Sequence, residues 1–159
     1  MHIKRLLVPI KGQRVDQDTL QFASSLVRQE HGSICLLYVV EVPREYPVDV
    51  ELPAEASKCE NVLHRAEEYL KSNKIKVETE MLQARDAGPA IVQEAHERNV
   101  DAVLLGLAYK RHHDSLAFGG VAPYIIEQSL CPVLVYREAK PKDVTPGSNE
   151  LPIFSPESR

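Results

Sequence analysis

The stretch Asp101–Tyr136, DAVLLGLAYKRHHDSLAFGGVAPYIIEQSLCPVLVY, decides the fold of this chain. It opens with the apolar run Ala102–Leu105, which predicts a strand buried on both faces of a sheet. Gly106 ends that run, and a polar, basic loop follows. Two further glycines then lead into apolar residues at helical spacing, namely Val121, Ala122, Ile125, Ile126 and Leu130. Pro132 breaks this helix, and Val133–Tyr136 predicts another buried strand. The unit is therefore strand, glycine-edged loop, helix, strand.

The glycines at the edges of this loop, Gly106 on one side and Gly119 with Gly120 on the other, suit the binding of an anion. Glycine lets the backbone approach a phosphate closely, and the free N–H groups at a helix start face such a ligand. We therefore expect a phosphate-binding loop between the strand and the helix.

Further strands precede this unit. They are predicted over Ile3–Ile10, Ser33–Val42 and Ile75–Leu82. The last of them alternates between apolar and polar residues at first, so we expect it at an edge of the sheet. Pro9 must lie near the end of the first strand, where its missing N–H costs little.

A helix pattern follows each of these strands. The first helix begins near Asp16 or Asp18 and is expected to stop at Gly32, since glycine suits a helix C-terminus. The second has a clear apolar stripe, and its other face is expected to be solvated surface: Glu60, Arg65, Glu67, Glu68 and Lys71. The third has Asp86 as its expected N-cap and ends near Asn99.

Five strands alternating with four helices predict an α/β fold with a parallel, doubly wound sheet and right-handed crossovers. With 159 residues the chain forms one domain by length. We place that domain at residues 1–138. Residues 139–159 are rich in proline, serine and charge and lack periodicity, so we expect a mobile tail.

Composition excludes several classes of protein. The formal net charge of −4 argues against a nucleic-acid binder, which would usually be basic. No apolar run approaches the roughly 18 residues that span a bilayer, and no basic-then-apolar leader is present, so we expect a cytoplasmic protein. Cys35, Cys59 and Cys131 lack metal-ligand spacing and are interpreted as small buried residues in a reducing compartment.

The stretch quoted above resembles the C-terminal signature of the universal stress protein family. ATP-binding members of that family show Gly, two residues, Gly, nine residues, and then Gly-Ser or Gly-Thr. Gly106 fits the first position and Gly119 the third, and LCPVLVYR resembles the family's usual ending. The resemblance covers roughly residues 3–138. It implies an adenine nucleotide alpha hydrolase-like sheet with strand order 3-2-1-4-5, and a crevice between the first and fourth strands.

The resemblance also indicates which residues border that crevice. Lys11 stands where ATP-binding relatives carry an aspartate that contacts the nucleoside, and Val39 fits a small apolar position against adenine. Tyr109 stands in place of the second glycine, and Gly120 in place of the hydroxyl residue. These three departures, Lys11, Tyr109 and Gly120, weigh against ordinary ATP binding. The candidate nucleotide-binding residues are Pro9, Lys11, Val39, Gly106, Tyr109, Lys110, Gly119, Gly120 and Val121.

The distribution of basic residues, by contrast, favours the binding of a phosphate-bearing ligand. Basic side chains would gather around the crevice, from Lys11, Lys110, Arg111, His112 and His113. Such a cluster favours a ligand with exposed phosphates, including a mono- or cyclic nucleotide. The alternative, which is the more common case, is that these basic residues are simply solvated surface on an acidic protein. His112, His113 and Asp114 lack a third ligand at suitable spacing, so we predict no metal site.

Function remains open between three hypotheses. The first is a non-catalytic regulatory domain that forms a homodimer through the strand Val133–Tyr136, with ATP, AMP or a cyclic nucleotide as candidate ligands. The second is the regulatory domain of a membrane transporter, because VVEVPREYP and QARDAGPAIVQEA resemble universal stress domains appended to permeases and antiporters. A cyclic dinucleotide is then a plausible ligand by analogy. The third is a slow ATPase relying on Asp114, although no nucleophile elbow or acid–base pair is evident.

Overall fold

The computed structural model describes residues 1–109 and 121–142. Its elements are β1 (Arg5–Pro9), α1 (Val15–Arg28), β2 (Ser33–Glu41), α2 (Pro53–Ser72), β3 (Lys76–Ala84), α3 (Ala87–Glu97), β4 (Ala102–Leu107), α4 (Val121–Gln128) and β5 (Val133–Arg137). All neighbouring strands pair in parallel, in the order β3-β2-β1-β4-β5. The predicted sheet and its order are therefore confirmed. The predictions for residues 110–120 and for the tail from 143 onward lie outside the described residues.

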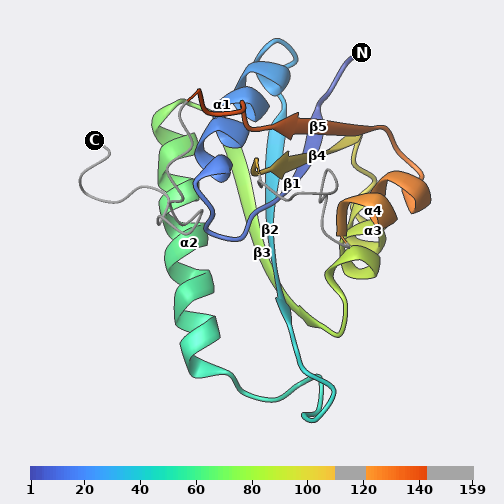
Figure 1. Ribbon diagram of the computed structural model, residues 1–159. Coiled ribbons are helices and arrows are strands. Elements are labelled where there is room, and N and C mark those ends of the chain that lie inside the picture. The colour runs from blue at the N-terminus through green and yellow to red at the C-terminus, as the bar shows by residue number, and fades with distance from the viewer. Residues whose placement is uncertain (110–120, 143–159) are drawn as a thin grey trace.

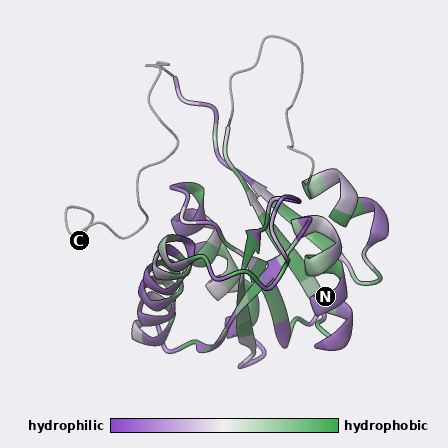
Figure 2. Ribbon diagram, turned by 90° about the horizontal axis from the view of Figure 1, so that it is seen from below, coloured by the Kyte–Doolittle hydropathy of each residue, from purple (hydrophilic) through white to green (hydrophobic). Residues whose placement is uncertain are grey.

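The sheet is a central layer between two pairs of helices (Figure 1). On β1, Leu6 and Val8 pack with α1 and α2, whereas Leu7 packs with α3 and α4. All three side chains are fully buried, which explains why these strands are apolar without interruption. Figure 2 shows hydrophobic residues gathered on the strands and hydrophilic residues on the outer surfaces of the helices.

β3 lies at one edge of the sheet and β5 at the other. Several β3 side chains are exposed, among them Glu78 and Thr79. This confirms the edge position that the alternating pattern predicts for this strand. Charged residues on β3 leave it poorly suited to pairing with another chain.

The end of α1 differs from the prediction. The residue with a left-handed backbone is His31, at φ 51°, so the expectation that Gly32 occupies the helix-ending position is wrong by one residue. The N–H of Gly32 donates to the carbonyl of Val27 at 2.9 Å, which closes the last turn. Glycine is required at 32 for a different reason, because a Cβ atom there would lie 2.7 Å from the carbonyl oxygen of Lys4.

Asp86 does occupy the N-cap position of α3, as predicted, although its side chain makes no capping hydrogen bond. Within residues 1–109 and 121–142, no helix combines the length and the apolar character that crossing a membrane requires.

Candidate functional site

The strand order reverses at β1, because the chain runs from β1 outward to β3 and then crosses back to β4 on the other side. In open parallel sheets, ligands sit beyond the carboxyl ends of the strands at such a reversal. Pro9 is the last residue of β1, and Lys11–Gln13 form the turn that follows it. Tyr109 follows the end of β4. The predicted site residues on these two connections therefore lie at the expected edge.

The turn after β1 is built around the carboxylate of Asp16, in the first turn of α1. One oxygen, Oδ2, accepts hydrogen bonds from the backbone N–H groups of Lys11 at 3.0 Å, Gly12 at 2.9 Å and Gln13 at 3.2 Å. Successive N–H groups that converge in this way form an anion-binding concavity. Here the protein's own carboxylate fills it, so those donors are not available to a ligand phosphate.

Asp16 is buried, with 4% of its surface exposed. Burial raises the pKa of its carboxyl from the ordinary value of 3.8 to about 6, because desolvation outweighs the three hydrogen bonds and the nearby charge of Lys11. Asp16 therefore titrates closer to neutrality than an exposed aspartate. No motif in the sequence predicts that Asp16 accepts the N–H groups of this turn. The available signal was an aspartate in the first helical turn after Gly12.

Gly12 makes the turn possible. Its φ of +83° lies in the left-handed region, which side chains rarely adopt, and a Cβ atom there would lie 2.9 Å from a methyl group of Val62 on α2. The turn after β1 is therefore held between Asp16 beneath it and α2 beside it.

A second carboxylate, that of Glu138 after β5, occupies the other side of the crevice. Its Oε2 accepts the backbone N–H of Tyr109 at 3.2 Å, and its Oε1 accepts two N–H groups of Arg14 at 2.6 and 3.0 Å. The guanidinium of Arg137 lies 5.7 Å from the centre of the Tyr109 ring. The connections after β1, β4 and β5 are thus tied together, and another backbone donor is satisfied within the protein.

Gly106 serves the packing of β4 on α1. A Cβ atom at this position would lie 2.2 Å from Oγ1 of Thr19, a buried residue of α1 whose hydroxyl donates to the carbonyl of Val15 at 2.7 Å. Packing alone therefore requires glycine at 106. Its role in approaching a phosphate stays a prediction.

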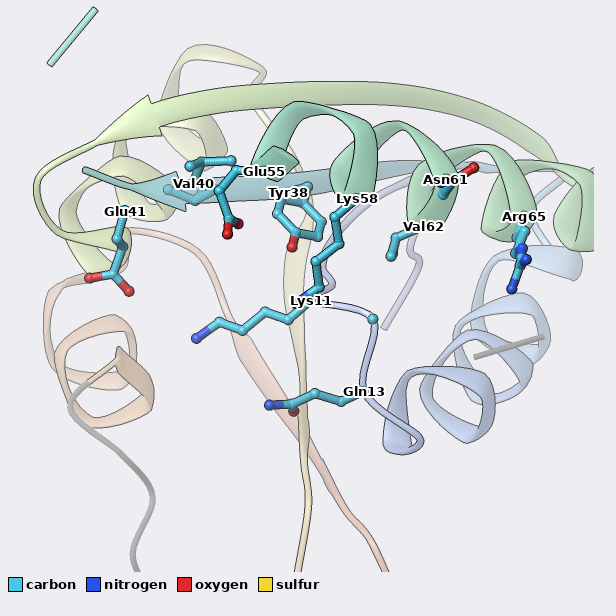
Figure 3. Close-up of a pocket in the computed structure, with 12 residues that line it drawn as sticks. Lys11, Gln13, Tyr38, Val40, Glu41, Glu55, Lys58, Asn61, Val62 and Arg65 are labelled. Carbon is cyan, nitrogen blue, oxygen red and sulfur yellow. The ribbon is translucent and has the colours of Figure 1, made fainter. Parts of the chain in front are cut away.

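An open groove of about 730 Å³ lies between the turn after β1, the end of β2 and α2 (Figure 3). It brings together two of the predicted site residues, Lys11 and Val39. From α2 it adds Glu55, Lys58, Asn61, Val62 and Arg65, and the remaining lining residues are Gly12, Gln13, Tyr38, Val40 and Glu41. Sequence reasoning missed the contribution of α2. The spacing of Lys58, Asn61 and Arg65 on one helical face was the signal for it.

Of the other predicted site residues, those within the described part of the chain do not line this groove. Pro9 ends β1, and Gly106 and Tyr109 take part in the contacts described above. Val121 begins α4 and packs partly buried against the core on the α3 and α4 side of the sheet. The remaining candidates, Lys110, Gly119 and Gly120, lie outside the described residues.

One expectation for α2 needs correction. Arg65, expected on a solvated face, is half-buried and lines the groove, because α2 turns that side toward the turn after β1. Cys35 and Cys59 are buried free thiols, as predicted, and burial raises the pKa of each to about 11. Cys131, also predicted to be buried, is only partly buried. Among the described residues, no group of three or more His, Cys, Asp or Glu is placed to hold a metal ion.

Comparison with known proteins identifies the family. The model of the "Universal stress protein family" matches residues 2–137. Universal stress protein MJ0531 of Methanocaldococcus jannaschii is 29% identical over 147 residues, covering 86% of this chain and 84% of that protein. The solved universal stress protein of Archaeoglobus fulgidus in complex with dAMP has a TM-score of 0.66 at 17% identity, covering 85% of this chain and 98% of its own.

A universal stress family protein from Arabidopsis thaliana, solved with AMP bound, also has a TM-score of 0.66, at 15% identity and with 88% and 97% of the two chains covered. At such low identity these two structures support the fold, and the family rests on the match over residues 2–137. The resemblance noted in the sequence is confirmed: the chain belongs to the universal stress protein family.

Proposed function

We propose that this chain is a non-catalytic regulatory domain that binds an adenine mononucleotide at the carboxyl edge of its sheet and works as a homodimer. The observation that carries the proposal is the open groove beside Lys11 and Val39, at the strand ends where parallel α/β sheets hold ligands. The structures named as complexes with dAMP and AMP belong to the same family and carry ligands of this class.

A mononucleotide fits the described crevice better than ATP does. A triphosphate needs many hydrogen-bond donors, and backbone N–H groups at strand ends commonly supply them. In this chain the N–H groups of Lys11, Gly12, Gln13 and Tyr109 already donate to Asp16 and Glu138. Replacing those carboxylates by a ligand would leave buried charge without partners, which is costly.

The non-catalytic part of the proposal rests on the carboxylates that the structure places at this edge. Asp16 and Glu138 are both engaged with backbone and arginine donors, so neither is placed to hold a phosphate-bound cation. Asp114, the candidate for a slow ATPase, lies outside the described residues. ATP hydrolysis above background that Asp114→Ala abolishes would replace this part of the proposal.

Dimerisation is proposed through β5. This strand pairs only with β4 among the described strands, and Val135 on it is 42% exposed. An apolar sheet edge is satisfied when two copies pair along it. Sedimentation should show a dimer at micromolar concentration, and Val135→Lys should shift it to monomer while the matched change on the opposite edge, Thr79→Lys, should not.

Nucleotide binding is tested by thermal unfolding with AMP, ATP, cyclic AMP and adenosine. A ligand at a hundredfold excess over its Kd stabilises the protein by about 2.7 kcal/mol, which is readily measured. We expect AMP to stabilise more than ATP at equal concentration, and Lys11→Ala to reduce the effect. Lys76→Ala, at the start of β3 and away from the groove, is the matched control. If no nucleotide changes the unfolding temperature, the proposed function is wrong.

A further inference from the structure

The groove has two walls that come from distant parts of the chain. One is the turn after β1, with Lys11, and the other is the inner face of α2. Lys58 and Arg65 on α2 are seven positions apart, about two helical turns, so they share one face. In Figure 3 the side chain of Lys58 extends from α2 toward Lys11 on the opposite wall.

The charges along the groove are not mixed evenly. Lys58 reaches toward Lys11 near its middle, and Arg65 lies farther along α2. Glu41 and Glu55 lie toward the other end, and the side chain of Lys11 extends in their direction (Figure 3). Within the part of the chain that the structure describes, neither lysine forms a salt bridge within 4.0 Å. Two lysines on opposite walls of one groove make it locally positive, so a bound anion would be attracted by both charges.

Backbone donors cannot take this role on the near wall. The N–H groups of Lys11, Gly12 and Gln13 all donate to Asp16. On this wall an anion would therefore be bound by side chains, and lysine and arginine are the donors that bind phosphate most strongly. The apolar floor from Val40 and Val62, with the hydroxyl of Tyr38, leaves room for the uncharged part of a ligand.

We propose that α2 supplies the phosphate subsite of this groove: Lys58, opposite Lys11 and with Arg65 beyond it, binds a phosphate monoester, and Glu41 and Glu55 accept hydrogen bonds from hydroxyl or amino groups at the ligand's other end. This inference rests on the proposed function in one respect, that the ligand is a mononucleotide. It goes further by assigning phosphate recognition to a helix face rather than to a glycine-rich loop.

The test separates the phosphate from the rest of the ligand. Calorimetric Kd values are measured for AMP and for adenosine with the unmodified chain, with Lys58→Ala and with Lys71→Ala. Lys71 is on the same helix but pairs with Glu67 outside the groove, which makes it a matched control. We expect Lys58→Ala to weaken AMP by about tenfold and to leave adenosine unchanged, since one charge-assisted hydrogen bond is lost. Lys71→Ala should change neither Kd.

Inorganic phosphate is titrated in parallel, with the amide signals of Lys58 and its neighbours followed by NMR. If AMP binds equally well to the Lys58→Ala variant while Lys11→Ala weakens it, the subsite on α2 is wrong and the proposed function stands. If no nucleotide binds but phosphate shifts these signals and Lys58→Ala abolishes the shift, the subsite stands and the proposed function fails. If Lys58→Ala changes the response to neither AMP nor phosphate, the inference is overturned.

Discussion

Gly106 on β4 and Thr19 on α1 are in contact so close that no side chain fits between them: a Cβ atom at 106 would lie 2.2 Å from Oγ1 of Thr19. Thr19 is buried and its hydroxyl donates to the carbonyl of Val15, so a shift of its side chain would disturb that hydrogen bond. This contact holds β4 against α1 directly below the crevice. The glycine that fits the first position of the family signature is thus needed for packing in this chain.

Gly106→Ala is expected to lower the free energy of unfolding by about 1–3 kcal/mol, the usual cost of overpacking a core. Chemical denaturation measures it. In a Thr19→Ala background the loss should be smaller, since the nearest atom, Oγ1, is gone, and the two changes should therefore be non-additive. Equal losses in both backgrounds would show that Thr19 is not what excludes a side chain at 106.

Asp16 makes the stability of the chain depend on pH. The pKa of its carboxyl is raised from 3.8 to about 6 in the folded protein, so the folded state binds more protons than the unfolded state between these values. The contribution of Asp16 to stability is therefore fully present below about pH 4 and is lost as pH rises through about 6. The loss amounts to about 3 kcal/mol at most.

Asp16→Asn removes this titration and keeps an oxygen that can accept the N–H groups of the turn. Denaturation at several pH values should show a fall in stability from pH 4 to pH 6 that is steeper in the unmodified chain than in the variant. The exposed Asp18 on the same helix gives the control, and Asp18→Asn should leave the slope unchanged. A rise in stability over this range that Asp16→Asn abolishes would mean that the three hydrogen bonds outweigh burial.

Glu138 is expected to control the opening of the backbone at Tyr109. Its carboxylate accepts the N–H of Tyr109 and the guanidinium of Arg14, so Glu138→Gln weakens both contacts at once. Hydrogen exchange at the Tyr109 amide should become faster by roughly fivefold, for a loss of about 1 kcal/mol. Glu127→Gln, an exposed change on α4, is the control. Unchanged exchange would show that another contact protects this amide.

The fold was predictable to a large extent because its signals are local. The alternation in IKVETEML indicates an edge strand, and the uninterrupted apolar run Ala102–Leu105 indicates a strand buried on both faces; both predictions agree with the structure. Helix ends were less predictable. A left-handed residue need not be glycine, and His31 adopts this conformation while Gly32 is selected by its contact with Lys4.

The candidate site was predictable only in part, because its contacts join residues far apart in the sequence. Lys11 and Val39 were named from the resemblance, and both line the groove. Glu138 pairs with Arg14, which is 124 positions away, and nothing in the local pattern of either residue indicates the other. Helical periodicity shows that Lys58 and Arg65 share a face, but not which element that face meets.

Lys74 offers a way to stabilise the chain without touching the site. It ends α2 with a left-handed backbone, at φ 61°, while the N–H of Ile75 donates to the carbonyl of Leu70 at 3.0 Å. A side chain in this conformation is strained, and glycine is not. Lys74→Gly should therefore raise the free energy of unfolding by about 0.5–1 kcal/mol. Lys71→Gly, one turn earlier and inside the helix, is the matched control and should lower it by about 1 kcal/mol. Both values come from urea denaturation at one pH, and destabilisation by both changes would mean that the Lys74 side chain makes contacts outweighing the backbone strain.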